Sequence, residues 1–381
     1  MAIALGGCAA SGATQSVTTS GKSLTIYISA PAGYQSNPAL AAVVAAEKLA
    51  FDGVAPGASE SYGQRAISGS GYALSLKVIT APAGMLSNNA RQAISNKNAI
   101  AYLGEITPGA SEQSAGIVNA QDLLQVSPGD TALELTHSTP AVPGAPKYFY
   151  ESYSTYGKTF ARVVPNAAVE ARAQTTEMKS LGVSTLAVGS DGTPYGRALA
   201  LAVSTDARAA GIATTASLAS ANGYFYGSAS VPVGAHAFSA ALSANPQLKL
   251  FAPSGLDSSS LVSAISPAPK SLYVSQPGFD PATLPAAGQA LYTTLKAQDG
   301  DEAIPAMFGY EAMAATLFAI HEVGKNVGNR SFVVKAFFAI SKRADSVLGP
   351  YSITAGDTSL QTFTFSRLKG GTLVPFTQVQ G

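Results

Sequence analysis

The chain has 381 residues, of which 46% are hydrophobic and 12% charged, and its formal net charge is +1. This composition argues against general disorder, and the lack of a Lys/Arg cluster argues against binding to nucleic acid. One cysteine and three scattered histidines also argue against a metal site. Because the length exceeds the size at which one core usually keeps growing, we expect two lobes.

Residues 1–22 are predicted to hold a short signal remnant and a flexible tether. Cys8 follows Leu5-Gly6-Gly7 and precedes a polar Ser/Thr/Gly stretch, which resembles a bacterial lipobox. In lipobox proteins this cysteine is lipidated, so we expect Cys8 to anchor the protein outside the cytoplasmic membrane. The basic region and the long apolar segment of a full signal are missing. Three alternatives stay open: the start lies too far downstream, the chain is trimmed, or Cys8 is an ordinary exposed thiol.

From Ser23 onward the pattern alternates between strands and helices. Strands are predicted over Ser23–Ala30, Ala73–Thr80, Ala99–Thr107 and Leu123–Gly129, and helices over Asn37–Asp52, Asn88–Lys97 and Ser111–Asp122. Strands that are separated by helix-length segments imply parallel pairing with right-handed crossovers. The first part of the chain is therefore expected to form a doubly wound sheet.

A second α/β series follows a Pro-rich loop. Its predicted helices are Tyr156–Gly182, Tyr195–Gly211, Ala235–Pro246 and Ser258–Ser266, and its predicted strands are Ser184–Ser190, Ile212–Ser220 and Leu248–Gly255. The chain then continues with a connecting strand at Lys270–Gly278, a long helix at Ala306–Gly324 and a hairpin within Gly349–Val379. The fold class is α/β.

Small polar residues follow two predicted strands of the first lobe. "TPGAS" contains Thr107, Gly109 and Ser111, and "SPGDT" runs from Ser127 to Thr131. Ligands of open α/β sheets bind at the carboxyl ends of the strands, where free backbone N–H groups favour an anion. Taken singly, each stretch is also explained as a helix cap or a tight turn.

No catalytic constellation stands out. His137 and His236 have no carboxylate or cysteine partner near them in sequence, and "HEVGK" at His321 lacks the second histidine of a zinc helix, so neither a triad nor a metal site is indicated. A hydrolase would need a nucleophile and a base that are not found. We therefore expect a binding protein without catalysis, cofactor or metal.

Four stretches, in this order, resemble a known family. They are "AYLGEITPGASEQSAGIVNAQDLLQVSPGDTALELT", "LAVGSDGTPYGRALA", "FGYEAMAATLFAIHEVG" and "VLGPYSITAGDTSLQTFTF". Together they are similar to the periplasmic type I solute-binding proteins of ABC importers, the family that includes the leucine/isoleucine/valine-binding proteins. The resemblance covers nearly the whole chain after the tether. It implies two doubly wound Rossmann-like lobes, joined by a hinge of three crossings, with a ligand between them.

The resemblance also suggests which residues bind the ligand. The family's carboxylate-binding group falls on Gly129, Asp130 and Thr131, its upstream serine position falls on Pro108 or Gly109 beside Thr107 and Ser111, and its second-lobe tyrosine falls on Tyr195. Tyr34 is expected to cover an apolar part of the ligand. For the family's ammonium-binding glutamate the nearest candidates are Ser254 and the aromatic group Tyr224, Phe225 and Tyr226.

Asp130 departs from the family pattern. Its carboxylate would repel the acid group of an amino acid unless the side chain points away. Alternatively, it would hold a ligand cation. The ligand is therefore left open among amino acids, amides, aromatic carboxylates and cations.

The resemblance implies crossings near 145–149, 272–276 and 349–352. Lobe 1 would then comprise residues 23–147 and 275–349, and lobe 2 residues 148–274 and 350–381. We expect a monomeric, extracytoplasmic component of the bacterial cell envelope that captures a small molecule by lobe closure and delivers it to an ABC permease. A sensory ligand-binding domain is the alternative, which the chain end at Gly381, with no membrane helix after the hairpin, disfavours.

Overall fold

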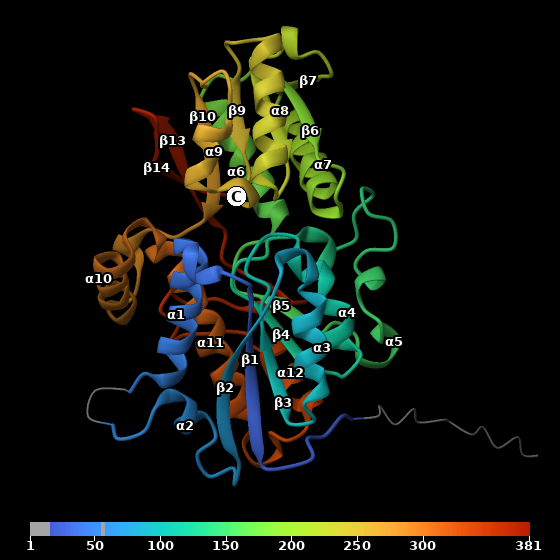
Figure 1. The fold of residues 1–381 in the computed structure, drawn as a ribbon, viewed down its shortest axis with the longest axis vertical. Coiled ribbons are helices and arrows are strands. Elements are labelled where there is room, and N and C mark those ends of the chain that lie inside the picture. Colours follow the sequence, from blue (N-terminus) through green and yellow to red (C-terminus); the bar gives the residue numbers. More distant parts are fainter. Residues whose placement is uncertain (1–15, 55–57) are drawn as a thin grey trace, which may run out of the picture.

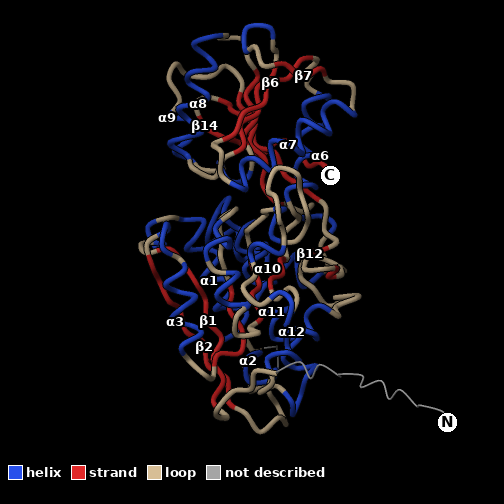
Figure 2. The backbone as a smooth tube through the Cα atoms, turned by 90° about the vertical axis from the view of Figure 1, so that its right-hand side faces the viewer, coloured by secondary structure: helices blue, strands red, loops and turns tan. Residues whose placement is uncertain are grey.

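The computed structural model describes residues 16–54 and 58–381, which form two α/β lobes (Figure 1). Each lobe has its own central sheet, and Figure 2 shows the two lobes stacked along the long axis of the molecule. Cys8 lies outside the described residues. The predicted fold class, two doubly wound lobes, is confirmed.

Lobe 1 contains a five-stranded parallel sheet in the order β2-β1-β3-β4-β5. The strands are β1 Ser23–Pro31, β2 Ala73–Ala81, β3 Ala99–Leu103, β4 Leu124–Ser127 and β5 Phe160–Arg162. The helices of this lobe are α1 Pro38–Asp52, α2 Tyr62–Ala66, α3 Ser87–Ser95, α4 Ala115–Asn119, α5 Tyr153–Tyr156, α10 Ala286–Asp299, α11 Ala303–Val323 and α12 Arg330–Phe338. Because helices cover both faces, β3 and β4 are buried along their whole length, which the continuous apolar run of β3 predicts.

Lobe 2 contains a seven-stranded sheet in the order β14-β13-β10-β9-β8-β6-β7. The strands are β6 Thr185–Ser190, β7 Ala213–Thr215, β8 Gly223–Gly227, β9 Lys249–Ala252, β10 Leu272–Pro277, β13 Thr362–Lys369 and β14 Thr372–Gln380. The helices are α6 Ala167–Ser180, α7 Pro194–Ala209, α8 Val231–Ala244 and α9 Ser259–Ala264. The predicted terminal hairpin is confirmed as the antiparallel pair β13–β14, which extends the sheet beyond β10.

Three helix starts are fixed by side-chain caps. The Asn37 side chain accepts the backbone N–H of Leu40 at the start of α1, and Asn166 caps α6 in the same way. At α7 the cap is Thr193, which accepts the N–H of Gly196. These caps set where α1, α6 and α7 begin, next to the region between the lobes.

The chain crosses between the lobes at residues 163–166, 278–285 and 359–361. The first crossing lies later than predicted, because Phe160–Arg162 pairs with β4 and belongs to lobe 1. The helix predicted over Tyr156–Gly182 was wrong in its first part, where the structure has this short strand. Pro165 cannot continue a helix through the preceding residues, so α6 begins only at Ala167.

The other two crossings also differ from the prediction. Residues 272–276 are part of β10 in the sheet of lobe 2. Residues 349–352 precede a small hairpin, β11 Ile353–Thr354 and β12 Asp357–Thr358, which contacts β5 and α12 of lobe 1. The lobe boundaries predicted from the resemblance are therefore displaced by several residues at each crossing.

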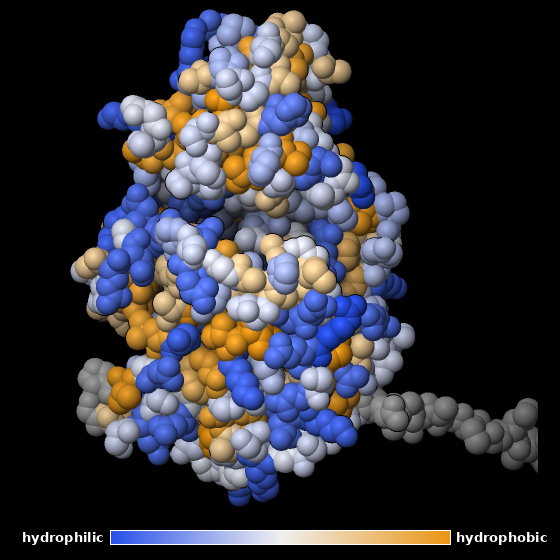
Figure 3. Space-filling model, in the orientation of Figure 1, coloured by the Kyte–Doolittle hydropathy of each residue, from blue (hydrophilic) through white to orange (hydrophobic). Residues whose placement is uncertain are grey.

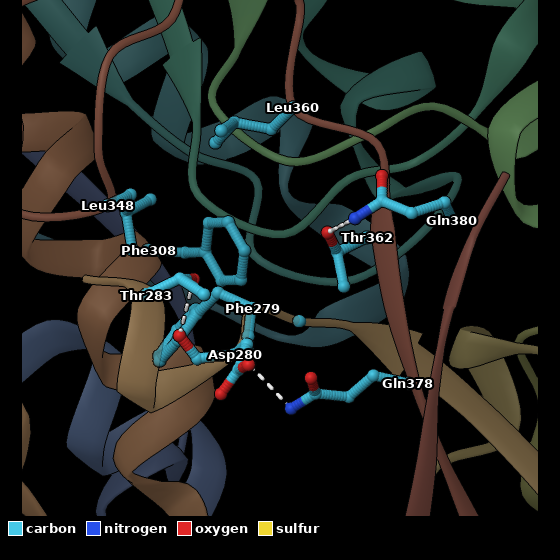
Figure 4. A pocket seen from close by; sticks show the side chains of 10 residues that line it. Phe279, Asp280, Thr283, Phe308, Leu348, Leu360, Thr362, Gln378 and Gln380 are labelled. Atoms are coloured by element: carbon cyan, nitrogen blue, oxygen red, sulfur yellow. Dashed lines mark hydrogen bonds between the residues drawn. The ribbon is translucent and has the colours of Figure 1, made fainter.

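The second crossing is hydrogen-bonded to the terminal hairpin, next to the third crossing. The backbone N–H of Gly278 donates to the carbonyl of Thr362 over 2.9 Å, and the Gln378 side chain donates to the carbonyl of Phe279 over 2.9 Å. A cavity of about 300 Å³ lies beside them (Figure 4). The ring of Phe308 from α11 reaches into this cavity. The second crossing is thus tied to β13 and β14 of lobe 2, while the crossing at residues 163–166 lies separately.

Within the described residues, one helical run, Ala286–Asn326, is long and apolar enough to cross a membrane by length and composition. However, 72% of its apolar window is buried inside the protein. The run contains α11, which packs against α1 and forms the core of lobe 1 on one face of the sheet. Its hydrophobicity is explained by this core position.

Candidate ligand-binding cleft

A cavity of about 270 Å³ lies between the lobes, and Figure 3 shows the surface hollowed at this level. We call it the interlobe cleft. Lobe 1 contributes Asn37, Pro38, Ala39, Leu40, Val43, Ile106, Thr107, Pro108, Pro128, Gly129, Glu302, Pro305 and Phe308; the remaining lining residues are Val164, Ser254, Asp257, Ser258, Ser259, Gln276 and Pro277. The cleft meets the carboxyl ends of β3 and β4 in lobe 1 and of β9 and β10 in lobe 2. This is the position where open α/β sheets bind ligands.

Two predicted residues of lobe 1, Thr107 and Gly129, line the cleft. Gly129 is required by a close approach of two loops. A Cβ atom at this position would lie 1.9 Å from the carbonyl oxygen of Ile106, so any side chain would push the loops apart. The two strand-end loops that the sequence singled out are therefore packed directly against each other.

The Asp130 carboxylate holds these loops together from behind the cleft. It accepts the backbone N–H groups of Gly109 and Ser111, both over 2.7 Å, and that of Ala132 over 3.0 Å. The Asp130 side chain is fully buried and does not line the cleft. The prediction left open whether this carboxylate points away from the ligand or binds a ligand cation. The structure favours the first alternative, because both carboxylate oxygens already accept backbone N–H groups.

Ser111 is also turned away from the cleft. Its hydroxyl accepts the backbone N–H of Glu105 over 3.0 Å, and the residue is fully buried. Gly109 packs against Tyr195 of lobe 2, because a Cβ at Gly109 would lie 3.0 Å from the Cβ of Tyr195. Gly109, Ser111 and Asp130 thus lie behind the cleft wall.

The predicted residues Thr131, Tyr195 and Ser254 meet where the two lobes touch. The Thr131 and Ser254 hydroxyl oxygens are 3.4 Å apart. The Tyr195 side chain is only 2% exposed, and its hydroxyl lies beside those of Ser254 and Thr131 without a hydrogen bond of normal geometry. Of these three residues only Ser254 lines the cleft. Burial raises the pKa of the Tyr195 phenol, so this hydroxyl stays protonated.

The structure places the other candidates elsewhere. Tyr34 packs against the core of lobe 1 and does not line the cleft. Tyr224, Phe225 and Tyr226 lie within β8, where Phe225 is fully buried in the sheet. The sequence prediction missed this strand, because its five residues contain two glycines and three aromatics without an apolar alternation.

Glu170 of α6 is a buried acid that sequence reasoning missed. Its carboxylate accepts the Ser254 backbone N–H over 2.6 Å, the Ser254 hydroxyl over 3.0 Å and the Ser275 hydroxyl over 2.7 Å. Burial raises the pKa of Glu170 to about 7, although these hydrogen bonds oppose the rise. Glu170 therefore fixes the loop that carries Ser254 into the cleft. The sequence signal that could have identified Glu170 is a carboxylate inside the apolar helix segment "AAVEARA".

Asp257 and Glu302 are two further acids that were not singled out. Asp257 follows β9 in lobe 2 and Glu302 precedes α11 in lobe 1, and both line the cleft. The Asp257 side chain is exposed within the cleft, yet atoms of both lobes surround it. This enclosure, with the negative charges of Glu302 and Glu170, raises its pKa to about 7. Asp257 follows the end of a strand, as Asp130 does. A search for polar residues at the strand ends of lobe 2, like the one made for lobe 1, would therefore have identified it.

No group of three His, Cys, Asp or Glu residues in the described part of the chain is arranged to hold a metal ion. Nor does a lysine, arginine or histidine occur among the residues that line the cleft. The cleft thus offers hydroxyls, carboxylates and apolar surface to a ligand.

Solved structures of substrate-binding proteins share this fold. A leucine-binding protein from Thermotoga maritima MSB8 matches with a TM-score of 0.72 at 16% identity, over 94% of this chain and 99% of that one. An ABC transporter substrate-binding protein from Desulfitobacterium hafniense, in complex with Leu, matches with a TM-score of 0.69 at 17% identity, over 93% and 100%. A solute-binding protein of an ABC transporter from R. palustris, in complex with benzoate, matches with a TM-score of 0.67 at 16% identity, over 94% and 96%.

A scan against protein-family models finds no match, and a search of curated proteins finds none either. At identities of 16–17% the likeness to the solved structures establishes the fold. The two-lobe architecture implied by the sequence resemblance is thereby confirmed over nearly the whole chain.

Proposed function

We propose that this protein is the extracytoplasmic solute-binding component of an ABC-type importer. It captures a small polar or amino-acid-like molecule in the interlobe cleft and delivers it to a membrane permease. The observation that carries this proposal is the position of the cleft, which meets the strand ends of both lobes and is bordered by the chain crossings. The similar structures come from ABC transporter binding proteins, which supports the same conclusion.

Ligand binding in such a cleft drives closure, because the closed form allows contacts with both lobes at once. The differential affinity that this requires is modest. To move a two-state equilibrium from 1:99 to 99:1, the ligand must bind the closed form more tightly by about 5.5 kcal/mol. A few hydrogen bonds and the burial of an apolar group are sufficient. The permease then recognises the closed form.

We assign direct ligand contacts to Thr107 and Gly129 on lobe 1 and to Ser254 on lobe 2, because these residues line the cleft. Thr131 and Tyr195 lie beside Ser254 and contribute hydroxyls once the lobes adjust around the ligand. Gly109, Ser111 and Asp130 act as supports that keep the strand-end loops in place. Tyr34 has no assigned contact.

The proposal includes a monomeric protein that is held at the outer side of the cytoplasmic membrane, with Cys8 as the lipid-bearing residue. It involves no chemical step on the ligand. The lipobox resemblance supports the anchor, and the likeness to importer components supports the permease partner.

The test is a thermal-shift screen of the purified protein against amino acids, amides, aromatic acids and amines, followed by calorimetry on each hit. A ligand at a hundredfold excess over its dissociation constant stabilises the folded form by about 2.7 kcal/mol. Small-angle scattering with and without the hit should show a more compact particle. No hit across the panel, with a folded and ligand-free protein, would contradict the proposal.

Two variants connect the hit to the cleft. Thr131→Ala and Tyr195→Phe should each weaken binding by about three- to thirtyfold, because each removes one hydroxyl and about 0.5–2 kcal/mol of hydrogen bonding. Phenylalanine is preferred to alanine at Tyr195 because the ring is part of the core of lobe 2. Unchanged affinity in both variants would refute their assignment.

A further inference from the structure

The interlobe cleft has an acidic side chain on each of its walls. Asp257 stands on the lobe 2 wall and Glu302 on the lobe 1 wall, and no basic side chain lines the space between them. Each of the two carboxyls has a raised pKa, for which enclosure by protein is the largest cause. The negative charges of Asp301 and Asp299 also raise the pKa of Glu302, and those of Glu302 and Glu170 raise the pKa of Asp257. Enclosed like charges of this kind favour a positively charged occupant.

The strand-end N–H groups that would receive an anion are already occupied. The Asp130 carboxylate accepts those of Gly109, Ser111 and Ala132, so the chain supplies its own anion to this loop. A ligand carboxylate would have to displace Asp130, which is fully buried. This edge of lobe 1 therefore offers little to a ligand acid group.

The start of α1 also borders the cleft, and a helix N-terminus normally favours an anion. Here the first helical residue is Pro38, which has no N–H group, and the N–H of Leu40 is taken by the Asn37 side chain. Only the N–H of Ala39 is left in this turn. The helix start therefore does not form an anion site comparable to the one that Asp130 fills.

The remaining surface suits the apolar body of a small molecule. Val43, Ile106, Val164, Pro305 and Phe308 all line the cleft. Beside Ser254, and not among the residues that line the cleft, the Tyr195 hydroxyl is buried and has no hydrogen-bond partner of normal geometry. This uncharged oxygen can accept a hydrogen bond from a ligand N–H once the lobes adjust around the ligand.

We propose that the cleft selects an organic ammonium ion with an apolar body and no carboxylate, held between Asp257 and Glu302. The proposal rests on the proposed function and names its ligand class. In this proposal the bound cation also stabilises the closed form of the protein. When the lobes approach, the carboxylates on the two walls repel each other, and a cation between them removes this repulsion. The amine therefore binds and favours the closed form through the same two contacts.

The test uses three ligands with one body and different charges: 2-phenylethylamine, phenylalanine and 3-phenylpropanoate. A second set of 3-methylbutylamine, leucine and 4-methylpentanoate varies the body. Calorimetry on the whole protein should show that, in at least one set, the amine binds at least tenfold more tightly than its amino acid and its acid. Asp257→Asn and Glu302→Gln should each weaken binding of the amine by about ten- to hundredfold, because each replaces a carboxylate acceptor with a neutral amide and adds an N–H donor that faces the ammonium.

Glu322→Gln is the matched control. This variant removes one exposed carboxylate from the other end of α11, away from the cleft, and should leave the affinity unchanged. If an amino acid or an acid binds best, or if Asp257→Asn and Glu302→Gln bind the amine as the native protein does, the cation inference is wrong while solute binding stands. If nothing binds, either in these sets or in the wider panel, the proposed function and the inference both fail.

Discussion

Truncation of Asp130 is expected to destabilise the protein more than its position in a loop suggests. The carboxylate accepts three backbone N–H groups, and Asp130→Ala leaves all three without a partner. Each unsatisfied buried donor costs about 1–3 kcal/mol. Because the vacated space admits some relaxation, we expect a total loss of about 3–6 kcal/mol in the free energy of unfolding. Asp130→Asn keeps one acceptor oxygen and should cost about 1–3 kcal/mol.

The assay is equilibrium denaturation in urea followed by far-ultraviolet circular dichroism, since the chain has no tryptophan. Formate replaces the carboxylate that Asp130→Ala removes, so it should raise the stability of this variant more than chloride at equal ionic strength. The native protein should show no such difference. Asp52→Ala, which changes an exposed aspartate at the end of α1, is the control and should change stability by less than about 0.5 kcal/mol. A loss below about 1 kcal/mol for Asp130→Ala would refute the reasoning.

Two further predictions concern buried charges. Burial raises the pKa of Glu170 from 4.5 to about 7. Between these two pH values the native protein therefore keeps a proton on Glu170 that the unfolded chain has lost. The contribution of this group to the free energy of unfolding is accordingly lost as the pH rises from about 4.5 to 7. Glu170→Gln should therefore reduce the drop in stability between pH 5 and pH 8, measured by urea unfolding, by about 3 kcal/mol; an equal drop in the native protein and the variant would contradict this. Arg162 is fully buried and its Nε lies 2.9 Å from Asp357, so Arg162→Met should cost about 3–5 kcal/mol by leaving that carboxylate with only His137 and Thr136 as partners among the described residues. Adding Asp357→Asn should recover part of this loss in the same assay, and an equal loss in the single and double variants would argue against a charge effect.

The sequence predicted the alternation of elements well, because parallel strands that are covered on both faces leave continuous apolar runs such as that of β3. It failed where an element is very short. The three residues of β5 carry no pattern that distinguishes them from the helix-like run around them, and this error displaced the first crossing. Pro165 was the signal that a helix could not pass through this segment.

The residues of the site were predicted only in part, because a local sequence pattern does not give the direction of a side chain in the folded protein. The composition of "SPGDT" identifies a strand end but not the direction in which Asp130 points, which depends on backbone donors from a loop about twenty residues earlier in the chain. The two walls of the cleft are likewise set by tertiary structure. Asp257 and Glu302 are separated in the sequence by α9, β10 and α10, and they come to face one cavity only because the chain returns to lobe 1 after β10.

The three crossings also constrain the order in which the protein can fold. Lobe 1 lacks α11, which forms much of its core, until the chain has been made to about Val323. Lobe 2 lacks β13 and β14 until the chain has been made to about Gln380, and until then β10 presents an unpaired edge. Neither lobe is a continuous piece of chain that can be completed early. Both lobes can therefore be completed only after most of these 381 residues have been made, and removal of Thr362 to Gly381 would expose that edge strand permanently.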